Sequence, residues 1–207
     1  MPMGLPDQWD TCSRSIPLEG GPHTFAHWGN TVAVGIERDI VLLDAITGIK
    51  TSVLRGHSGW VGSLEFSLDG TLLISLSLDA IVNLWDLQTG AVIRSFGDDT
   101  EDISAASISP NGITIALGTK SGTIHLWNIR TGKCRSFQPP PNGEISAIRF
   151  SPIDSRRFIS SSENTVQQWD IDGHQIGNSY QDADYTDNLA YSSNGTLFVS
   201  SGGGCCG

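Results

Sequence analysis

Three residue types that together can cleave an ester or peptide bond lie close together in the chain: His57, Ser75 and Asp79. In a serine hydrolase, a histidine takes the proton of the serine hydroxyl and an aspartate orients the imidazole. That chemistry also needs the serine exposed in a cleft that a substrate can reach. The residue types alone leave two interpretations open, a catalytic triad and a buried hydrogen-bonded network that stabilises the fold.

A second candidate chemistry is zinc binding by His23 and His27, which have the H-x-x-x-H spacing. That spacing brings two imidazoles together only on a helix, where residues four apart stack on one face. Here the segment has the pattern of a strand, in which four residues span about 13 Å. The cysteines form no C-x-x-C pair and are predicted to be reduced thiols; they are Cys12, Cys134, Cys205 and Cys206. We therefore predict no metal site and no cofactor.

Four carboxylates are concentrated in one short run, Asp98-Asp99-Thr100-Glu101-Asp102. Such a run could attract a cation or a basic peptide, but it lacks the glycine and the terminal glutamate of an EF-hand loop. We interpret the run as a solvated loop between two structural repeats.

A repeat of 42 residues determines the elements that must position these side chains. Leu43, Trp85, Trp127 and Trp169 follow one another at this spacing, each followed by Asp or Asn and then by a turn ending in Gly. A second repeating element ends a strand with an Asp/Asn-Gly or related turn, a strong hairpin signal; its copies begin at Phe66, Ile108, Phe150 and Tyr191.

Within one period the sequence predicts four short strands rich in β-branched and aromatic residues. In the clearest repeat these are Trp60–Phe66, Thr71–Ser77, Ile81–Asp86 and Ala91–Phe96. No stretch has a sustained helical period of apolar residues. Four antiparallel strands in a period of about 40–45 residues are typical of a β-propeller blade.

The combination of Gly56-His57, Asp79 and Trp85-Asp86 resembles the WD40-repeat β-propeller family, and the resemblance covers about residues 9 to 200. It implies that His57, Ser75, Asp79 and Trp85 form a structural tetrad, a buried hydrogen-bond chain that ties the outer part of a blade to its inner strands. A buried imidazole and carboxylate need such partners. On this interpretation the chain has no catalytic residue and is not an enzyme; a propeller-fold hydrolase stays as the less favoured alternative.

The predicted fold is an all-β WD40-type propeller with four full blades and a split or partial fifth. The predicted repeats cover about residues 21–55, 56–97, 98–138 and 139–181; a partial blade takes 7–20 and 186–201, and a tail takes 202–207. Three arrangements stay open: an open arc, a small closed ring, and pairing with a second copy through open blade edges. Among these, the open arc is favoured on the basis of the unpaired strand edges at its two ends.

The other repeats depart from the full tetrad pattern. In the third repeat, Asp99, Leu117 and Ser121 occupy the His, Ser and Asp positions, and only Trp127 matches. In the fourth repeat, Ser160, Glu163 and Trp169 fill three of the positions. We therefore predict that the second blade is the most rigid.

The resemblance also implies a docking face, because loops at the narrow end of a propeller are where the family usually binds partners. Carried over by position, the candidate partner-binding residues are Trp60, Leu78, Asp102, Ser104, Lys120, Glu144, Ser146 and Ser162. An exposed Trp beside a Leu with a polar rim is typical of a binding hot spot. The alternative is that Trp60 packs on neighbouring loops.

The net charge of −10 and the sequence pI of about 4.7 argue against nucleic acid and anionic membranes as partners, since both attract basic surfaces. We expect a protein or peptide partner, in particular a basic one. No apolar run approaches the about 18 residues of a membrane span, and the first residues lack a secretory signal. The expected location is the cytoplasm, with the nucleus as the alternative.

The predicted function is a non-catalytic interaction scaffold or ligand-sensing module. A truncated propeller without independent function is the main alternative. Asp44-Ala45-Ile46-Thr47-Gly48 and the run from Trp169 to Ile176 also resemble the WD40 arrays of fungal NACHT–WD40 receptor-like proteins. The nucleotide-binding loop G-x-x-x-x-G-K-[ST] is not found in this sequence.

Overall fold

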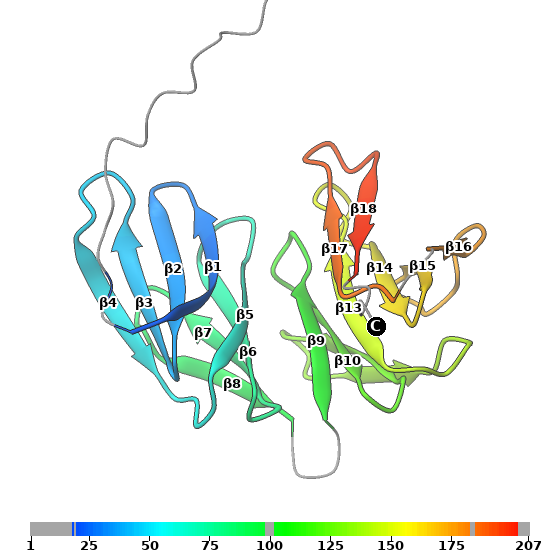
Figure 1. The fold of residues 1–207 in the computed structure, drawn as a ribbon, viewed down its shortest axis with the longest axis horizontal. Helices are drawn as coiled ribbons and strands as arrows, with labels where there is room; N and C mark the ends of the chain where they lie inside the picture. The colour runs from blue at the N-terminus through cyan, green and yellow to red at the C-terminus, as the bar shows by residue number, and fades with distance from the viewer. Residues whose placement is uncertain (1–17, 19, 98–101, 183–184, 203–207) are drawn as a thin grey trace, which may run out of the picture.

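The computed structural model describes residues 18, 20–97, 102–182 and 185–202, and within these ranges it contains strands and no helix (Figure 1). Four sheets have four strands each, and one further sheet has two. The all-β fold of stacked blades predicted from the sequence is confirmed. None of the described segments is a helix of the length and apolarity needed to cross a membrane.

Each sheet is an antiparallel meander whose strands follow one another along the chain. The first two sheets contain β1 (Pro22–Trp28), β2 (Thr31–Ile36), β3 (Asp39–Asp44) and β4 (Lys50–Arg55), then β5 (Val61–Phe66), β6 (Leu72–Ser77), β7 (Val82–Asp86) and β8 (Val92–Phe96). The third and fourth contain β9 (Ile103–Ile108), β10 (Thr114–Thr119), β11 (Ile124–Asn128) and β12 (Cys134–Phe137), then β13 (Ile145–Phe150), β14 (Arg157–Ser162), β15 (Thr165–Asp170) and β16 (Tyr180–Gln181). A hairpin of β17 (Asn188–Tyr191) and β18 (Phe198–Ser201) follows.

The repeating Asp or Asn after the third strand of each blade caps a tight turn. Asp86 Oδ1 accepts a hydrogen bond from the Thr89 amide at 2.8 Å, and Asn128 Oδ1 accepts one from the Thr131 amide at 2.9 Å. The glycine that ends each turn has a positive φ, 70° at Gly90 and 68° at Gly132, which only glycine adopts without strain. These side chains therefore serve the turn.

Apolar residues form one layer between each pair of successive sheets. Leu54, Leu73 and Trp85 belong to the layer between the first and second sheets, and Leu84, Ile115 and Leu117 to the next. Phe158 and Trp169 lie in the layer between the third and fourth sheets, and Leu189 of the hairpin closes the last layer. Because a strand exposes alternate side chains to opposite faces, each blade can contribute to two layers.

The blades form an open arc among the described residues. Each sheet packs on its sequence neighbours, and the first sheet makes no extensive contact with the β17–β18 hairpin. Figure 1 shows the innermost strands β1, β5, β9 and β13 toward the middle of the molecule, with β4 and β16 on the outside. The predicted half-blade at residues 7–20 lies outside the described residues except for positions 18 and 20.

A β-bulge recurs near the start of the innermost strand of every four-stranded sheet. The register shifts at His23, Gly62, Ser104 and Ser146. A bulge redirects its side chain out of the regular alternation. Three of these residues reach the next blade: His23 stacks on Trp60 at 4.5 Å between ring centroids, Ser104 donates to the Ile145 carbonyl at 2.8 Å, and Ser146 donates to the Thr186 carbonyl at 2.5 Å.

Candidate functional site

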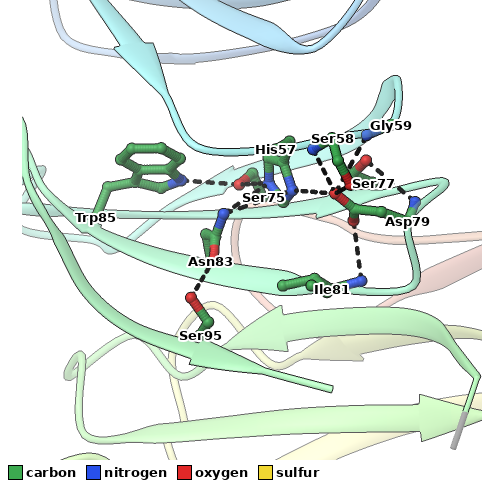
Figure 2. A network of polar contacts seen from close by, with 10 residues as sticks. All are labelled: His57, Ser58, Gly59, Ser75, Ser77, Asp79, Ile81, Asn83, Trp85 and Ser95. Carbon is green, nitrogen blue, oxygen red and sulfur yellow. Dashed lines mark hydrogen bonds and ion pairs between the residues drawn. The ribbon is translucent and has the colours of Figure 1, made fainter. Parts of the chain in front are cut away.

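The structure brings His57, Ser75, Asp79 and Trp85 into one hydrogen-bonded chain (Figure 2). The Trp85 indole N–H donates to Ser75 Oγ at 2.8 Å, and Ser75 Oγ lies 2.7 Å from His57 Nε2. On the other side of the ring, His57 Nδ1 lies 3.3 Å from Asp79 Oδ2.

The electrostatics of this chain favour a neutral imidazole and an ionised carboxylate. Burial lowers the pKa of His57, and Asp79 opposes that shift only in part. Burial would raise the pKa of Asp79, but hydrogen bonds from the backbone amides of Ser58, Ile81 and Gly59 outweigh it and hold the pKa at about 2. The Asp79 carboxylate therefore receives most of its hydrogen bonds from backbone amides of the loop and the turn that it joins.

Ser75 is fully buried, at 0% exposure, so a substrate cannot reach its hydroxyl. A hydrolytic nucleophile must be accessible, and the arrangement therefore stabilises the blade. Sequence reasoning missed one member of this network: Asn83 contacts His57 Nε2 at 3.3 Å and accepts a 2.6 Å hydrogen bond from Ser95. Its position two residues before Trp85 on the same strand was the available signal, since strand residues two apart share a face.

The fourth blade contains only part of this chain. Trp169 donates to Ser160 Oγ at 2.9 Å, as the corresponding pair does in the second blade. Glu163, assigned from sequence to the Asp position, has a φ of 56° in the turn and makes no hydrogen bond to either residue. The third blade places the fully buried Leu117 at the Ser position.

Five of the candidate docking residues line one cavity of about 410 Å³. The cavity lies among β5, β9, β13 and β17, and its lining includes Leu78, Ser104, Lys120, Glu144 and Ser146. The structure thus gathers residues from three blades, and those of different blades are 24 to 68 positions apart in the sequence.

The remaining three candidates lie around this cavity without lining it. Asp102 forms an ion pair with Lys120 at 3.1 Å. Trp60 is 51% exposed, and its carbonyl accepts a hydrogen bond from the Leu78 amide. Ser162 is buried, at 3% exposure.

The bulge residues explain why the cavity opens beside the second blade. Ser104 and Ser146 use their hydroxyls to bond the next blade, but the second blade has Gly62 at this position and no side chain there. A Cβ added at Gly62 would meet only the Leu76 carbonyl oxygen, at 3.9 Å. The missing side chain therefore leaves space at the wall of the cavity.

A deeper polar link joins three successive blades below the cavity. Ser107 Oγ donates to Glu65 Oε1 at 3.0 Å and accepts from the Phe150 amide at 3.1 Å. Burial raises the pKa of Glu65 to about 7, with Arg149 and Ser107 opposing. Glu65, Ser107 and Arg149 are spaced 42 residues apart, so the repeat period was a signal that could have placed them side by side.

No cluster of three or more potential metal ligands occurs among the described residues. His23 and His27 lie on strand β1, as the sequence pattern predicts. Cys134 is exposed, whereas Cys12, Cys205, Cys206 and most of the acidic run at 98–102 lie outside the described part of the chain.

Two segments, residues 48–86 and 90–128, match the family described as WD domain, G-beta repeat. WD repeat-containing protein 36 of Homo sapiens is 30% identical over 106 residues, which are 50% of this chain and 12% of that protein. U3 small nucleolar RNA-associated protein 21 of Saccharomyces cerevisiae is 36% identical over 77 residues, or 37% of this chain and 8% of that protein.

A third relative, F-box and WD repeat domain containing protein 10B of Homo sapiens, is 33% identical over 108 residues, or 52% of this chain and 13% of that protein. The matches thus cover only 8 to 13% of the length of these three relatives. The names of the two human relatives describe them as WD-repeat proteins.

Proposed function

We propose that this chain, which carries WD40 repeats in an all-β fold of stacked blades, is a non-catalytic module that binds a protein or peptide. The binding surface, here called the docking face, consists of Trp60, Leu78 and the cavity beside them. The observation that carries the proposal is the exposure of two large apolar side chains, 51% at Trp60 and 79% at Leu78, at the edge of that cavity.

The docking face has the composition of a hot spot with a polar rim. Trp60 is held by its stack on His23, so little side-chain freedom is lost when a partner covers it. Lys120 and Glu144 line the cavity next to Leu78, and such polar side chains give specificity around an apolar anchor. The rigid strands under these side chains make surface complementarity without turnover the supported mechanism.

The test is to select peptides on the immobilised chain and to measure the affinity of the selected peptides by calorimetry. Trp60→Ala is expected to weaken binding by about 2 kcal/mol, or about 30-fold, and Leu78→Ser to weaken it in the same direction. Ile46→Ser is the matched control, because Ile46 is similarly exposed, at 68%, in a turn of the first blade. Equal affinity for the wild type and Trp60→Ala would rule out the docking face.

Self-association through the open blades is the second candidate function. Phe25 on the innermost strand of the first blade is 74% exposed, and Val199 of the terminal hairpin is 66% exposed. Light scattering after size-exclusion chromatography at several concentrations tests this candidate. A mass that rises with concentration and falls in a Phe25→Ser variant supports it, and a constant mass near 22.1 kDa contradicts it.

Three finer expectations belong to the same proposal. Kinship to fungal NACHT–WD40 proteins, a cytoplasmic or nuclear location and the lack of catalysis all stay predictions. The last is supported by the burial of Ser75. Microscopy of a fluorescent fusion tests the location directly.

A further inference from the structure

We propose that a second surface, separate from the docking face, binds a glutamate or aspartate side chain of a protein partner through the guanidinium of Arg94. The site is a pocket of about 220 Å³ between the outer strand β8 of the second blade and strands β10 and β11 of the third. We call it the arginine pocket and define it by four of the residues that line it, Arg94, Phe96, Leu117 and Trp127. The inference goes beyond the proposed function, because none of these residues belongs to the docking face.

Two aromatic rings hold the guanidinium of Arg94 in place. Its central carbon lies 4.7 Å from the centre of the Trp127 ring and 5.5 Å from the centre of the Phe96 ring. The two rings also contact each other, with 5.6 Å between their centroids. A guanidinium that lies over a ring uses its flat face, whereas its N–H donors point outward in its own plane. The donors of Arg94 are therefore available to a ligand that approaches from the edge.

The positive charge of Arg94 is not compensated within the part of the chain that the structure describes. There, Arg94 contacts the two rings but forms no ion pair and no side-chain hydrogen bond. The sequence on both sides of the pocket is also poor in negative charge, since residues 87–97 and 103–143 contain no Asp or Glu. The second of these stretches contains several cations: Lys120, Arg130, Lys133 and Arg135. Although the whole chain has a net charge of −10, its third blade therefore has an excess of positive charge, which attracts negative groups.

The junction between the third and fourth blades shows what occupies the equivalent place. Arg135 has the register position of Arg94, because each pairs with the residue before the tryptophan of its blade. Phe137 and Trp169 contact each other there at 5.2 Å between centroids, like the two rings of the arginine pocket. Arg135 Nη1 donates to the Asp172 carbonyl oxygen at 2.5 Å and lies 3.5 Å from Asp172 Oδ1. A carboxylate from the next blade thus neutralises the arginine at that junction.

The corresponding turn of the third blade has the opposite charge. Asp172 and Arg130 each lie two residues after the Asp or Asn that caps the turn. This turn approaches Arg94, because a Cβ added at Gly132 would lie 3.7 Å from Arg94 Nη1. Arg130 offers no acceptor in place of the aspartate. At the junction of the second and third blades, the place of the carboxylate is therefore left to a ligand.

The pocket has the size and the lining for one acidic side chain. Pockets for drug-sized molecules have about 300–1,000 Å³, so about 220 Å³ suits a single side chain. Leu117 and Ile103 are 2% and 7% exposed and contribute apolar lining, on which the methylene groups of a glutamate can pack. A bidentate arginine–carboxylate pair is among the strongest hydrogen-bonded pairs in proteins. A guanidinium held by stacking loses little freedom when it forms one.

The single guanidinium favours a carboxylate over a phosphate group. Among the described residues that line the pocket, Arg94 is the one with a permanent positive charge. Phosphate groups carry nearly twice the charge of a carboxylate and are typically bound by clusters of arginines. The charge of the pocket therefore matches that of one glutamate or aspartate.

The experiment is an NMR titration of the full chain with N-acetyl-glutamate methylamide. N-acetyl-glutamine methylamide, which has the same shape without the charge, is the matched probe. We expect saturable shifts of the Trp127 indole N–H and of the backbone amides at 94–97 and 124–127 with the glutamate probe, and none with the glutamine probe. Arg94→Gln is expected to weaken binding of the glutamate probe at least about ten-fold, because its charge-assisted hydrogen bonds are lost.

The control is Arg135→Gln, which removes the same charge at the equivalent register position. Arg135 is already engaged by Asp172, so this variant is expected to bind the probe like the wild type. Equal weakening in the Arg94→Gln and Arg135→Gln variants would show attraction by net charge only and would overturn the proposal. Absence of saturable shifts in the wild type would overturn it as well.

A second variant supplies the carboxylate from within the chain. Arg130→Asp gives the third blade the residue type that the fourth has at this position of the turn, and it is expected to weaken the glutamate probe by several-fold. Lys50→Asp, which makes the same change of net charge in the first blade, is its control. Equal affinities of the two variants would contradict the equivalence of the two junctions, on which the proposal depends.

Two other occupants of the pocket are outcomes of the same titration. Tighter binding of inorganic phosphate than of the glutamate probe would overturn the assignment to a carboxylate. Binding of the probe only by the variant Asp98→Asn/Asp99→Asn/Glu101→Gln would show that the acidic run of the chain itself fills the pocket, and would overturn the assignment to a partner. Trp60→Ala is expected to leave probe binding unchanged, so the arginine pocket and the docking face can fail independently.

Discussion

The second and third blades have the same strand order and the same capped turns, but they are held together in different ways. The second blade contains the chain from Trp85 through Ser75 and His57 to Asp79. The third places the buried Leu117 where the second has Ser75, and its Trp127 indole is covered by Phe96 and by the Arg94 guanidinium, 4.7 Å above the ring. The polar network is therefore not needed to form a blade, since apolar packing and turn residues suffice.

The additional effect of the network is to fix the position of the loop that precedes β5, the innermost strand of the second blade. Asp79 accepts hydrogen bonds from the amides of Ser58 and Gly59, which join that loop to the turn between β6 and β7. Trp60 and Leu78 belong to these two segments, so the network also holds the docking face. Changes in the tetrad, at the blade junction and in the cavity wall would test this difference, and they follow in order of decreasing expected effect on stability.

The largest effect is expected from removal of the tetrad tryptophan. Trp85 is 1% exposed, so Trp85→Ala loses both a large buried ring and a hydrogen bond and is expected to cost about 4 kcal/mol of the free energy of unfolding. Trp127→Ala, at a half-buried site, is expected to cost about half as much. Chemical denaturation measures both, and equal losses would contradict the comparison.

The contribution of the junction between the two blades to the free energy of unfolding is expected to decrease as pH rises, whereas the contribution of the tetrad decreases as pH falls. Because the pKa of Glu65 rises from 4.5 to about 7 on folding, the folded state holds a proton that the unfolded state has released between these values. Stability should fall as pH rises through this window, by about 3 kcal/mol. Glu65→Gln should remove that loss, as measured by unfolding at about pH 5 and about pH 8.

The tetrad itself loses stability on acidification, because the folded state depresses the pKa of both His57 and Asp79. The imidazole contribution falls as pH drops below 6.5, and the carboxylate contribution falls as pH drops from 3.8 through about 2. A Glu65→Gln variant that still loses stability between about pH 5 and about pH 8 would contradict the assignment of that loss to the blade junction.

Removal of the serine hydroxyl is expected to destabilise the second blade, which has the full network, more than the fourth blade, which has only part of it. Ser75→Ala leaves the Trp85 N–H without a partner and removes the shortest hydrogen bond of His57 Nε2, and it is expected to cost about 2 kcal/mol. Ser160→Ala in the fourth blade leaves only the Trp169 N–H and is expected to cost about 1 kcal/mol. Unfolding curves of the two variants give the difference, and a larger loss in the fourth blade would refute it.

The smallest effect on stability is expected at Gly62. Gly62→Ser introduces the residue that the third and fourth blades have at this position, where a Cβ fits, and should change the free energy of unfolding by no more than about 0.5 kcal/mol. Selected peptides should nevertheless bind more weakly, because the side chain enters the cavity. Unaltered peptide affinity with unaltered stability would show that the cavity is not used.

The strands and turns were predictable because their signals are local. In the second repeat the predicted strands differ from β5, β6, β7 and β8 by one residue at their first positions only. Alternating apolar residues and Asp/Asn-Gly turns depend on neighbours in sequence, which is why a single chain shows them. The grouping of His57, Ser75, Asp79 and Trp85 came from the family pattern.

The candidate site was only partly predictable. Position in the repeat grouped Leu78, Ser104, Lys120, Glu144 and Ser146, which line one cavity. It did not reveal that the Ser104 and Ser146 hydroxyls are bonded to the next blade, or that Glu163 leaves the tetrad position. Those outcomes depend on bulges and on a turn conformation that a regular repeat does not encode.

The sequence by itself determined the number of strands in each blade, the turns that join them and the faces that they bury. Only the tertiary structure decided which polar groups of different blades meet, as Ser107 meets Glu65 and as Ser104 meets the Ile145 carbonyl. Secondary structure follows from interactions between residues close in the chain, whereas a contact about 40 residues away depends on how sheets twist and stack. The pairing of charges and hydroxyls around the cavity is therefore a property of the assembled blades.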